Sequence, residues 1–316
     1  MKRIGIFGWG IVAPKSPNVE VFEQNLAQAT TWLEPLQGFG PSNFLVGRPE
    51  FDFSVYKPWM DERFGPRKYS QLDEKMGNMV KYAIGAFIQS LQQNPGMDKL
   101  LQELESQAHV YVGTGLGDFS LQYDRVLVYY KAQKRWNRFW CQEDKNKELA
   151  AYHQAPSDEK QRIRNQLQSP PDPAEMDSVH ESYEDTQEAW YAFWIQRSDG
   201  LRRYLEELRE IEAEGLTGDI DTGKMHLIRR KTGARRKLNS KYGCPIEPWN
   251  AVDPTLLWNI PNIPAAQISM IGKITGAAFA PVAACSGFGT ALKVAMNAIQ
   301  LGQAKAAVIG TTDPEP

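Results

Sequence analysis

Apolar positions along this chain follow two patterns, one typical of strands and one typical of helices. A short apolar run that leads into glycines predicts a strand at residues 3–12. A spacing of three to four residues between apolar positions predicts helices over residues 178–214 and 290–301. The two patterns together predict an α/β protein that contains an additional helical region.

Residues 119–249 lie between two stretches of mixed strand and helix pattern and differ from both in composition. The segment 125–140 is basic and aromatic, and a proline-rich break follows at residues 169–173. We therefore predict a helical, charged subdomain at 119–249. It is inserted into an α/β domain formed by residues 1–118 and 250–316.

The composition limits the possible classes of function. At 316 residues, with 42% hydrophobic and 23% charged residues, the chain can bury a sizeable core. A formal net charge of −2 gives no electrostatic case for binding nucleic acid or an anionic membrane, and no run of about 18 apolar residues predicts a membrane span. Three scattered cysteines are too few for a disulfide framework, which favours a reducing, cytoplasmic setting. Pro14, soon after the first apolar run, favours a strand there over a signal peptide.

Cys285 is the strongest candidate for chemistry. It lies between an apolar stretch and the predicted helix at 290–301, which places the thiol at the first turn of a helix. Unpaired backbone N–H groups and the positive end of the helix dipole favour a thiolate there, and so a nucleophile at neutral pH. The alternative is a buried structural cysteine packed against Ala283, Ala284 and Ala291.

The segment around this cysteine resembles the nucleophile segment of the β-ketoacyl synthases of the thiolase superfamily. In that family an Asn-x-x-x-x-x-Ile-Ser segment leads through glycines to an Ala-Cys-Ser/Ala-Ser/Gly turn, a helix and a strand ending in Gly-Gly. The matching residues here are Asn262, Ile268-Ser269, Gly272, Gly276, Ala284-Cys285-Ser286-Gly287, Gly302 and Gly310. One departure is Thr311, where the family more often has a second glycine.

The beginning of the chain resembles the same family. The matching stretches are a strand and turn at 3–14, a helix at 21–26, a long helix at 68–91, and a strand and turn at 110–117. The resemblance implies the N-terminal half of a thiolase-like α/β fold, a mixed sheet with flanking helices, to which the helical subdomain is added.

The residues Gly8-Trp9-Gly10-Ile11-Val12-Ala13 also match the G-x-G-x-x-A pattern of dinucleotide-binding folds. In such a site a helix starts inside the glycine motif and receives the pyrophosphate. Pro14 and Pro17 fall where that helix would run, and an internal proline costs about 3 kcal/mol. We therefore disfavour a dinucleotide site here.

The resemblance implies a decarboxylative Claisen condensation of acyl thioesters, of the fatty acid or polyketide type. Cys285 would accept the acyl group, with its backbone N–H in the oxyanion hole beside Ala284 and Ser286. Phe279 and Phe288 would either line the acyl pocket or pack inside the helix core. The implied partners are an acyl carrier protein and a second ketosynthase chain, as a homodimer or as a heterodimer with a C-terminal half. No cofactor or metal is implied. The alternatives are a non-catalytic partner subunit and a non-decarboxylating acyltransferase of the same superfamily.

A basic run at residues 224–238 contains Arg229, Arg230, Arg235 and Arg236. Charge runs often form only the solvated face of a helix. Because carrier proteins are acidic, the resemblance gives a sharper prediction, in which these four arginines dock the carrier. Glutamates just before the run counter its positive field and disfavour a nucleic-acid role.

The four histidines of the chain, His109, His153, His180 and His226, lack the spacing of metal ligands. In the resembled family, the second half of the fold carries two histidines that stabilise the enolate and the oxyanion. None of the four occupies such a motif. We therefore expect that this chain alone does not catalyse condensation, as a truncated product, one half of a split synthase or a degenerate partner.

Overall fold

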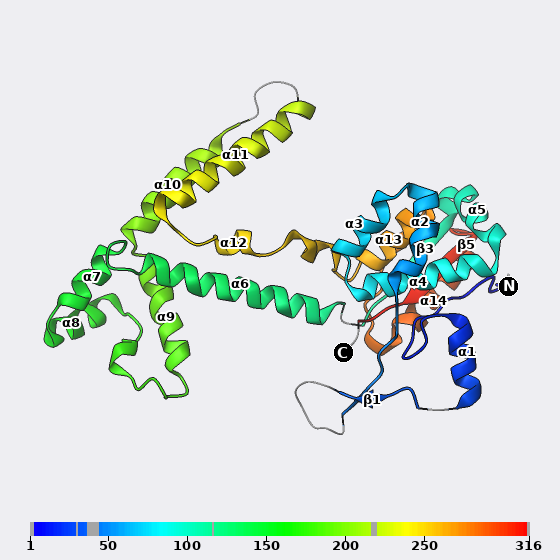
Figure 1. Cartoon of the computed structure of the whole chain (residues 1–316), viewed down its shortest axis with the longest axis horizontal. Helices are drawn as coiled ribbons and strands as arrows, with labels where there is room; N and C mark the ends of the chain where they lie inside the picture. The colour runs from blue at the N-terminus through cyan, green and yellow to red at the C-terminus, as the bar shows by residue number, and fades with distance from the viewer. Residues whose placement is uncertain (1–2, 30, 37–43, 116, 216–219, 315–316) are drawn as a thin grey trace. The chain divides into compact units, whose positions relative to one another are not determined.

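The computed structural model describes residues 3–29, 31–36, 44–115, 117–215 and 220–314, with the backbone alone at 220–223. The chain forms two compact units, whose elements are labelled in Figure 1. Unit 1 comprises Met1–Asp124 and Pro254–Pro316, and unit 2 comprises Arg125–Asp253. That unit 2 is an insertion into a ketosynthase fold remains a prediction.

A three-stranded parallel sheet forms the centre of unit 1. Strand β3 (Ala108–Gly113) lies between β4 (Ala278–Phe279) and β5 (Ala306–Thr311). β3 and β5 pair along their whole length, which sets Gly113 opposite Thr311. Because the three strands run in the same direction, their C-terminal ends meet at one edge, which we call the carboxyl edge. The α/β fold class that the sequence predicts is confirmed.

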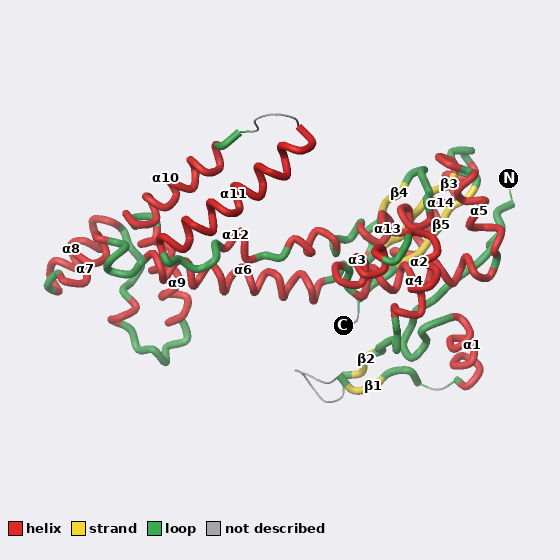
Figure 2. The backbone as a smooth tube through the Cα atoms, turned by 45° about the horizontal axis from the view of Figure 1, so that its top comes forward, coloured by secondary structure: helices red, strands yellow, loops and turns green. Residues whose placement is uncertain are grey.

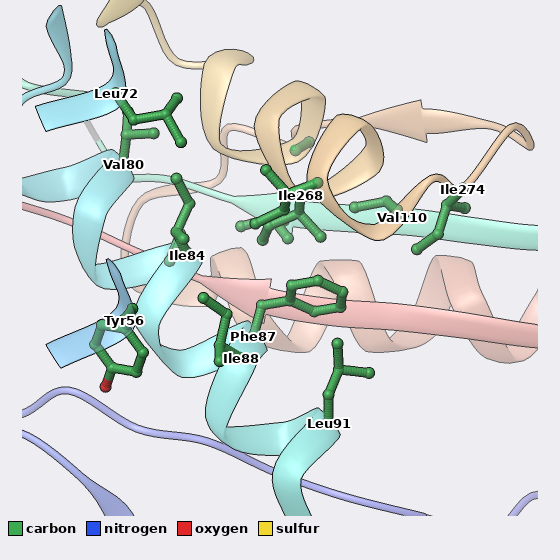
Figure 3. Close-up of a cluster of buried hydrophobic side chains, with 14 of the residues drawn as sticks. Tyr56, Leu72, Val80, Ile84, Phe87, Ile88, Leu91, Val110, Ile268 and Ile274 are labelled. Atoms are coloured by element: carbon green, nitrogen blue, oxygen red, sulfur yellow. The ribbon is translucent and has the colours of Figure 1, made fainter. Parts of the chain in front are cut away.

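Helices α4 (Asn78–Gln93) and α13 (Ile263–Gly272) cover one face of the sheet. Val110 of β3 is fully buried there in a cluster with Ile84 and Ile268, as Figure 3 shows. Successive side chains of a strand point to opposite faces, so every second residue of β3 joins this cluster. Burial of apolar area contributes about 25 cal/mol per Å². This cluster is therefore the main hydrophobic core of unit 1.

Helix α14 (Gly287–Gln300) covers the opposite face. Tyr111 and Ile309 pack there against a row of small residues, Ala291, Ala295 and Ala298. The small side chains let the helix lie close to the strands. The sheet is thus the middle of three layers, with the carboxyl edge at the start of α14.

The first helix begins after both early prolines. α1 (Val19–Gln28) starts with Asn18, whose Oδ1 accepts a backbone hydrogen bond at 2.9 Å. No helix starts within residues 8–13, all of which the structure describes. The remaining regular elements of unit 1 are β1 (Glu34–Pro35), β2 (Leu45–Val46), α2 (Lys57–Phe64), α3 (Arg67–Lys75) and α5 (Pro95–Glu103), with 3₁₀ turns at Phe53–Tyr56, Glu105–Gln107 and Pro254–Trp258.

The prediction of a first strand is wrong, because residues 3–12 contain no strand. They run beside α4, where the N–H of Ile11 donates to Oε1 of Gln89 at 3.1 Å. A β-carbon at Gly10 would lie 1.9 Å from the carbonyl oxygen of Ala86, so only glycine permits this approach. Strand β3 is already paired with another strand on both sides, so residues 3–12 cannot pair with β3.

The long helix expected over residues 68–91 is two helices, α3 and α4, separated at Met76 and Gly77. Met76 takes an extended conformation, and the N–H of Gly77 donates to Oδ1 of Asn259 at 2.5 Å. A β-carbon at Gly77 would lie 2.2 Å from Oδ2 of Asp118. The break therefore depends on close packing that a helical spacing does not reveal.

Unit 2 is helical, and its described residues contain no strand (Figure 2). Its first helix, α6 (Phe119–Trp140), begins in unit 1, where the N–H of Leu121 donates to Oδ1 of Asp118 at 3.1 Å and so caps the helix. The other helices are α7 (Lys147–Gln154), α8 (Ser157–Leu167), α9 (Tyr183–Ile195), α10 (Asp199–Ala213), α11 (Ile220–Tyr242) and α12 (Pro248–Ala251).

The helix predicted over residues 178–214 is interrupted, so that α9 and α10 are separate. Ser198 causes the break, because its hydroxyl accepts the N–H of Leu201 at 3.1 Å and donates to the carbonyl oxygen of Lys145 at 2.8 Å. The apolar residues on the two sides serve different clusters. Trp194 packs in one and Tyr204 in the other.

Candidate active site

Cys285 lies at the carboxyl edge of the sheet of unit 1. A short connection after β4 leads to a 3₁₀ turn, Ala284–Ser286, which carries the cysteine and passes directly into α14. The thiol is exposed. The predicted place at the start of a helix is confirmed, although the turn precedes the first helical residue, Gly287. The alternative of a buried structural cysteine is wrong.

No side chain caps the start of α14, but the N–H groups of Ser286 and Gly287 already donate to the carbonyl oxygens of Ala283 and Ala284. Ser286 precedes the helix, but its hydroxyl donates back to the carbonyl oxygen of Ala283 at 2.7 Å and caps no helical N–H. Ala284 has a φ of +44°, in the left-handed region, which costs a non-glycine residue about 1–2 kcal/mol. The first N–H groups of a helix have no partner within it and attract negative charge. The turn is therefore suited to hold an oxyanion or a thiolate.

Glycines beneath the turn bring the strands and the cysteine segment together. A β-carbon at Gly113 would lie 2.7 Å from the carbonyl oxygen of Pro281. At Gly276 it would lie 2.1 Å from the carbonyl oxygen of Ala108. Any larger residue would push the segment off the sheet, so these glycines fix the position of Cys285 relative to β3.

Polar residues follow β5 at the same edge. Oδ1 of Asp313 accepts the N–H of Gly115 at 2.6 Å, which ties the ends of β5 and β3 together. The hydroxyl of Thr312 donates to the carbonyl oxygen of Met79 at 2.6 Å. Neither residue was predicted from the sequence to be functional. The feature that could have indicated them is that polar side chains directly follow a buried strand, a common place for functional groups in parallel sheets.

The two phenylalanines predicted to line an acyl pocket are both about half exposed, Phe279 at 45% and Phe288 at 47%. The ring of Phe279 packs edge-on against Tyr111, with centroids 4.9 Å apart. Phe288 shares one side of α14 with Leu292 and Met296, which are also exposed. The start of α14 thus offers a set of apolar side chains near the thiol.

The other two cysteines lie in unit 2 and are not suited to act as nucleophiles. Burial raises the pKa of Cys141 to about 12. Burial, followed by the charge of Glu247, raises the pKa of Cys244 to about 11. Since the thiolate is the reactive form, both thiols are suppressed near neutral pH, whereas Cys285 is open to solvent.

The four arginines predicted to dock a carrier fall into two groups, two that form ion pairs and two that do not. Arg230 pairs with Glu214 at 2.9 Å, and Arg235 pairs with Glu212 at 2.6 Å, both between α11 and the end of α10. Arg229 and Arg236 are exposed on α11, and neither has an ion pair with a described residue. The two free arginines are seven residues apart and so lie on one side of the helix.

One of the four histidines belongs to unit 1, and three belong to unit 2. His109 is buried in β3, where its Nδ1 lies 2.5 Å from the hydroxyl oxygen of Tyr111. His153, His180 and His226 belong to unit 2. Among the described residues, no three His, Cys, Asp or Glu side chains are placed to hold a metal ion. No described helix is long and apolar enough to cross a membrane.

The exposed thiol of Cys285 thus stands at a helix start on the carboxyl edge of a parallel sheet, a position suited to a nucleophile. Residues 228–315 match the family model described as the β-ketoacyl synthase, N-terminal domain, over less than a third of the chain. This segment therefore belongs to a β-ketoacyl synthase N-terminal domain of the thiolase superfamily, and the resemblance is confirmed there. A comparison with curated proteins found no significant match. The family implies a condensing, acyl-transferring type of function.

The match begins inside α11, within the segment 119–249 that the sequence analysis assigns to an insertion. It includes Cys285 and the whole of α14. The likenesses at residues 3–26, 68–91 and 110–117 lie outside it and stay predictions, and Leu116 of the last stretch lies outside the described residues.

Proposed function

We propose that Cys285 is the acyl-accepting nucleophile of a β-ketoacyl synthase-type condensation. In the first step its thiolate attacks the carbonyl carbon of an acyl thioester delivered by an acyl carrier protein. The new C–S bond forms as the carrier thiolate leaves, and the oxyanion of the intermediate is held by backbone N–H groups, including that of Cys285. The product of this step is an acyl-cysteine.

In the second step a malonyl-type thioester loses its carboxylate as CO₂. The electron pair left on the α-carbon attacks the carbonyl carbon of the acyl-cysteine. The intermediate collapses, the Cys285 thiolate leaves, and a β-ketoacyl thioester is released. Phe279 and Phe288, with the neighbouring apolar side chains of α14, are proposed to contact the acyl chain.

One observation carries this proposal. The exposed thiol of Cys285 stands at the uncapped start of α14, within the segment that matches the family. We further propose that Arg229 and Arg236, rather than the paired arginines, contact the acidic carrier. A homodimer, or a heterodimer with a C-terminal ketosynthase half, is the proposed assembly. The free cysteines support a cytoplasmic setting.

A second candidate is a non-catalytic partner subunit of a ketosynthase assembly. It is favoured by His109, the one histidine of unit 1, which is buried against Tyr111. The decarboxylation step needs a group that stabilises the carbanion. Both candidates contain the exposed thiol of Cys285, so they differ in condensation and not in the presence of an acyl acceptor.

Acyl transfer and condensation can be tested separately. The purified chain is incubated with acyl carrier thioesters of graded chain length, and its intact mass is measured, with Cys285→Ala as the control. We expect one acyl adduct in the wild type and none in the variant. Wild-type chain that stays unmodified with every thioester would contradict the nucleophile proposal. Acylation without β-ketoacyl product on adding a malonyl thioester is expected of a split half and of a partner subunit alike, whereas β-ketoacyl product from the chain alone would contradict the partner subunit.

A further inference from the structure

The three residues at the C-terminal end of β5 differ in how their side chains are used. Thr312 and Asp313 are engaged within the protein, through the carbonyl oxygen of Met79 and the N–H of Gly115. Thr311 is exposed, and among the described residues its hydroxyl has no hydrogen-bond partner. One polar group at this edge is therefore free to meet a ligand.

The position of Thr311 sets this hydroxyl beside the turn that carries the nucleophile. Thr311 is opposite Gly113 in the sheet and lies on the face that α14 covers, after Ile309. Its Oγ1 lies 3.2 Å from the place that a β-carbon of Gly287 would occupy. Gly287 is the first residue of α14, two positions beyond Cys285.

Thr311 stands where the resembled family more often has glycine. A glycine would leave the space beside the turn empty, whereas threonine adds a methyl group and a hydroxyl. The neighbouring positions on the same face, Ile309 and Tyr111, are buried or packed against α14. The hydroxyl at the end of this row of residues lowers the stability of the protein little if solvent or substrate forms a hydrogen bond with it.

We propose that Thr311 is a substrate-contacting residue, whose hydroxyl donates a hydrogen bond to the acyl thioester at Cys285. This inference rests on the proposed function. The contact orients the thioester carbonyl toward the thiolate and narrows the space beside the first acyl carbons. Thr311 thus contributes to acyl transfer and to acyl selection, and it leaves the thiol itself unchanged.

The test compares three variants of the full chain: Thr311→Val, which keeps the shape and loses the hydroxyl, Thr311→Ser, which keeps the hydroxyl, and Thr311→Gly, which restores the family residue. The probes are acetyl and octanoyl thioesters of N-acetylcysteamine, and acylation is followed by intact mass. Alkylation of Cys285 by iodoacetamide serves as the control reaction, because it needs the thiol and no acyl carbonyl.

We expect Thr311→Val and Thr311→Gly to slow acylation on the order of tenfold, the effect of losing one hydrogen bond in the transition state. Thr311→Ser should retain most of the rate, and alkylation should stay unchanged in all three. Equal acylation of Thr311→Val and wild type would overturn the inference. Parallel loss of acylation and alkylation would also overturn it, since Thr311 would then act on the thiol or the fold. Failure of the wild type to be acylated would instead overturn the proposed function, and this inference with it.

Discussion

Units 1 and 2 bury different kinds of side chain. The main core of unit 1 is largely aliphatic and is built around a parallel sheet, with Ile84, Ile88 and Val110 fully buried. Unit 2 has no strand among its described residues and buries aromatic rings in two clusters. The fully or almost fully buried rings of unit 2 are those of Trp136, Trp140, Tyr152, Trp190, Trp194 and Tyr204.

The difference shows how each unit satisfies its polar groups. In unit 1 the strands pair their backbone groups with one another, and buried uncharged side chains such as Gln89, Asn259 and Thr312 add further hydrogen bonds. In unit 2, buried polar side chains join the helices. The hydroxyl of Tyr152 donates to Asp172 at 2.8 Å, and that of Tyr204 donates to Glu247 at 2.7 Å. The fold of unit 2 therefore depends on charged groups, and that of unit 1 on close backbone packing.

The largest expected contrast between the units is in thiol reactivity. With iodoacetamide at about pH 8, only about one Cys141 thiol in ten thousand is ionised, because its pKa is raised to about 12. Cys285, exposed at the start of α14, should be labelled at least a hundredfold faster than Cys141 or Cys244. Peptide mapping of the folded protein measures the three sites. Labelling of Cys141 or Cys244 before Cys285 would contradict the assignment of the nucleophile.

A second large effect is expected in the aromatic core of unit 2. Trp194 is 1% exposed and its ring lies 5.5 Å from that of Trp190, so Trp194→Ala should cost about 3–5 kcal/mol. Trp249→Ala is the matched control, since Trp249 is 53% exposed, and it should cost about 1 kcal/mol or less. Urea unfolding followed by circular dichroism measures both.

Because each cluster of buried side chains draws its residues from one unit, the damage from Trp194→Ala should be confined to unit 2. Amide hydrogen exchange of β3 and α4 should keep the wild-type protection. Loss of protection in β3 would mean that the aromatic helices also support the sheet, and that the chain is not divided into independent units.

Strands β3 and β5 are indicated by the family resemblance, whereas helix α14 and the place of Cys285 could be predicted from the local pattern, an amphipathic run after a turn that contains glycine. The first strand could not, since residues 3–12 have the same apolar pattern whether they pair in a sheet or lie along a helix. The hydrogen-bond partner of this segment is Gln89, which is distant in the sequence, and this contact places the segment along a helix. Local spacing also cannot show that α9 and α10 serve different clusters, or that Arg235 is paired with Glu212.

A smaller effect concerns the pH dependence of unit 2. Burial acts to raise the pKa of Glu247, but hydrogen bonds from Tyr204, its own backbone, Asn250 and Asn239 together lower it below the ordinary value of 4.5. A lowered pKa means that the ionised carboxylate stabilises the folded state at pH values above 4.5, and that this stability is lost as the pH falls through the folded-state pKa.

Glu247→Gln removes the charge and keeps the shape, so it should lower stability near neutral pH by about 1–3 kcal/mol and flatten the loss of stability in acid. Urea midpoints measured from neutral pH down to acid test this, with Glu206→Gln on the exposed side of α10 as the control. An equally steep acid loss in Glu247→Gln would show that other carboxylates cause the acid sensitivity of unit 2.

The smallest expected effect is on carrier binding, which should depend on the free arginines of α11 and not on the paired ones. The double reversal Arg229→Glu with Arg236→Glu should weaken binding of an acidic carrier by a few fold and reduce its dependence on salt, because exposed charges act mainly by screened attraction. The matched control is Arg202→Glu with Arg209→Glu, which also reverses two exposed arginines seven residues apart, on α10. Affinity is measured over a salt titration.

Reversal of Arg230 and Arg235 should act differently, because it breaks their pairs with Glu214 and Glu212 and sets like charges together. We expect these changes to lower the stability of the hairpin formed by α10 and α11, by about 1 kcal/mol per pair or less, and to affect binding only through that loss. If the Arg202 and Arg209 control weakens binding as much as the Arg229 and Arg236 reversal, net charge alone explains the effect. The free face of α11 would then be an ordinary solvated surface, and the docking site would have to be sought at the carboxyl edge beside Cys285.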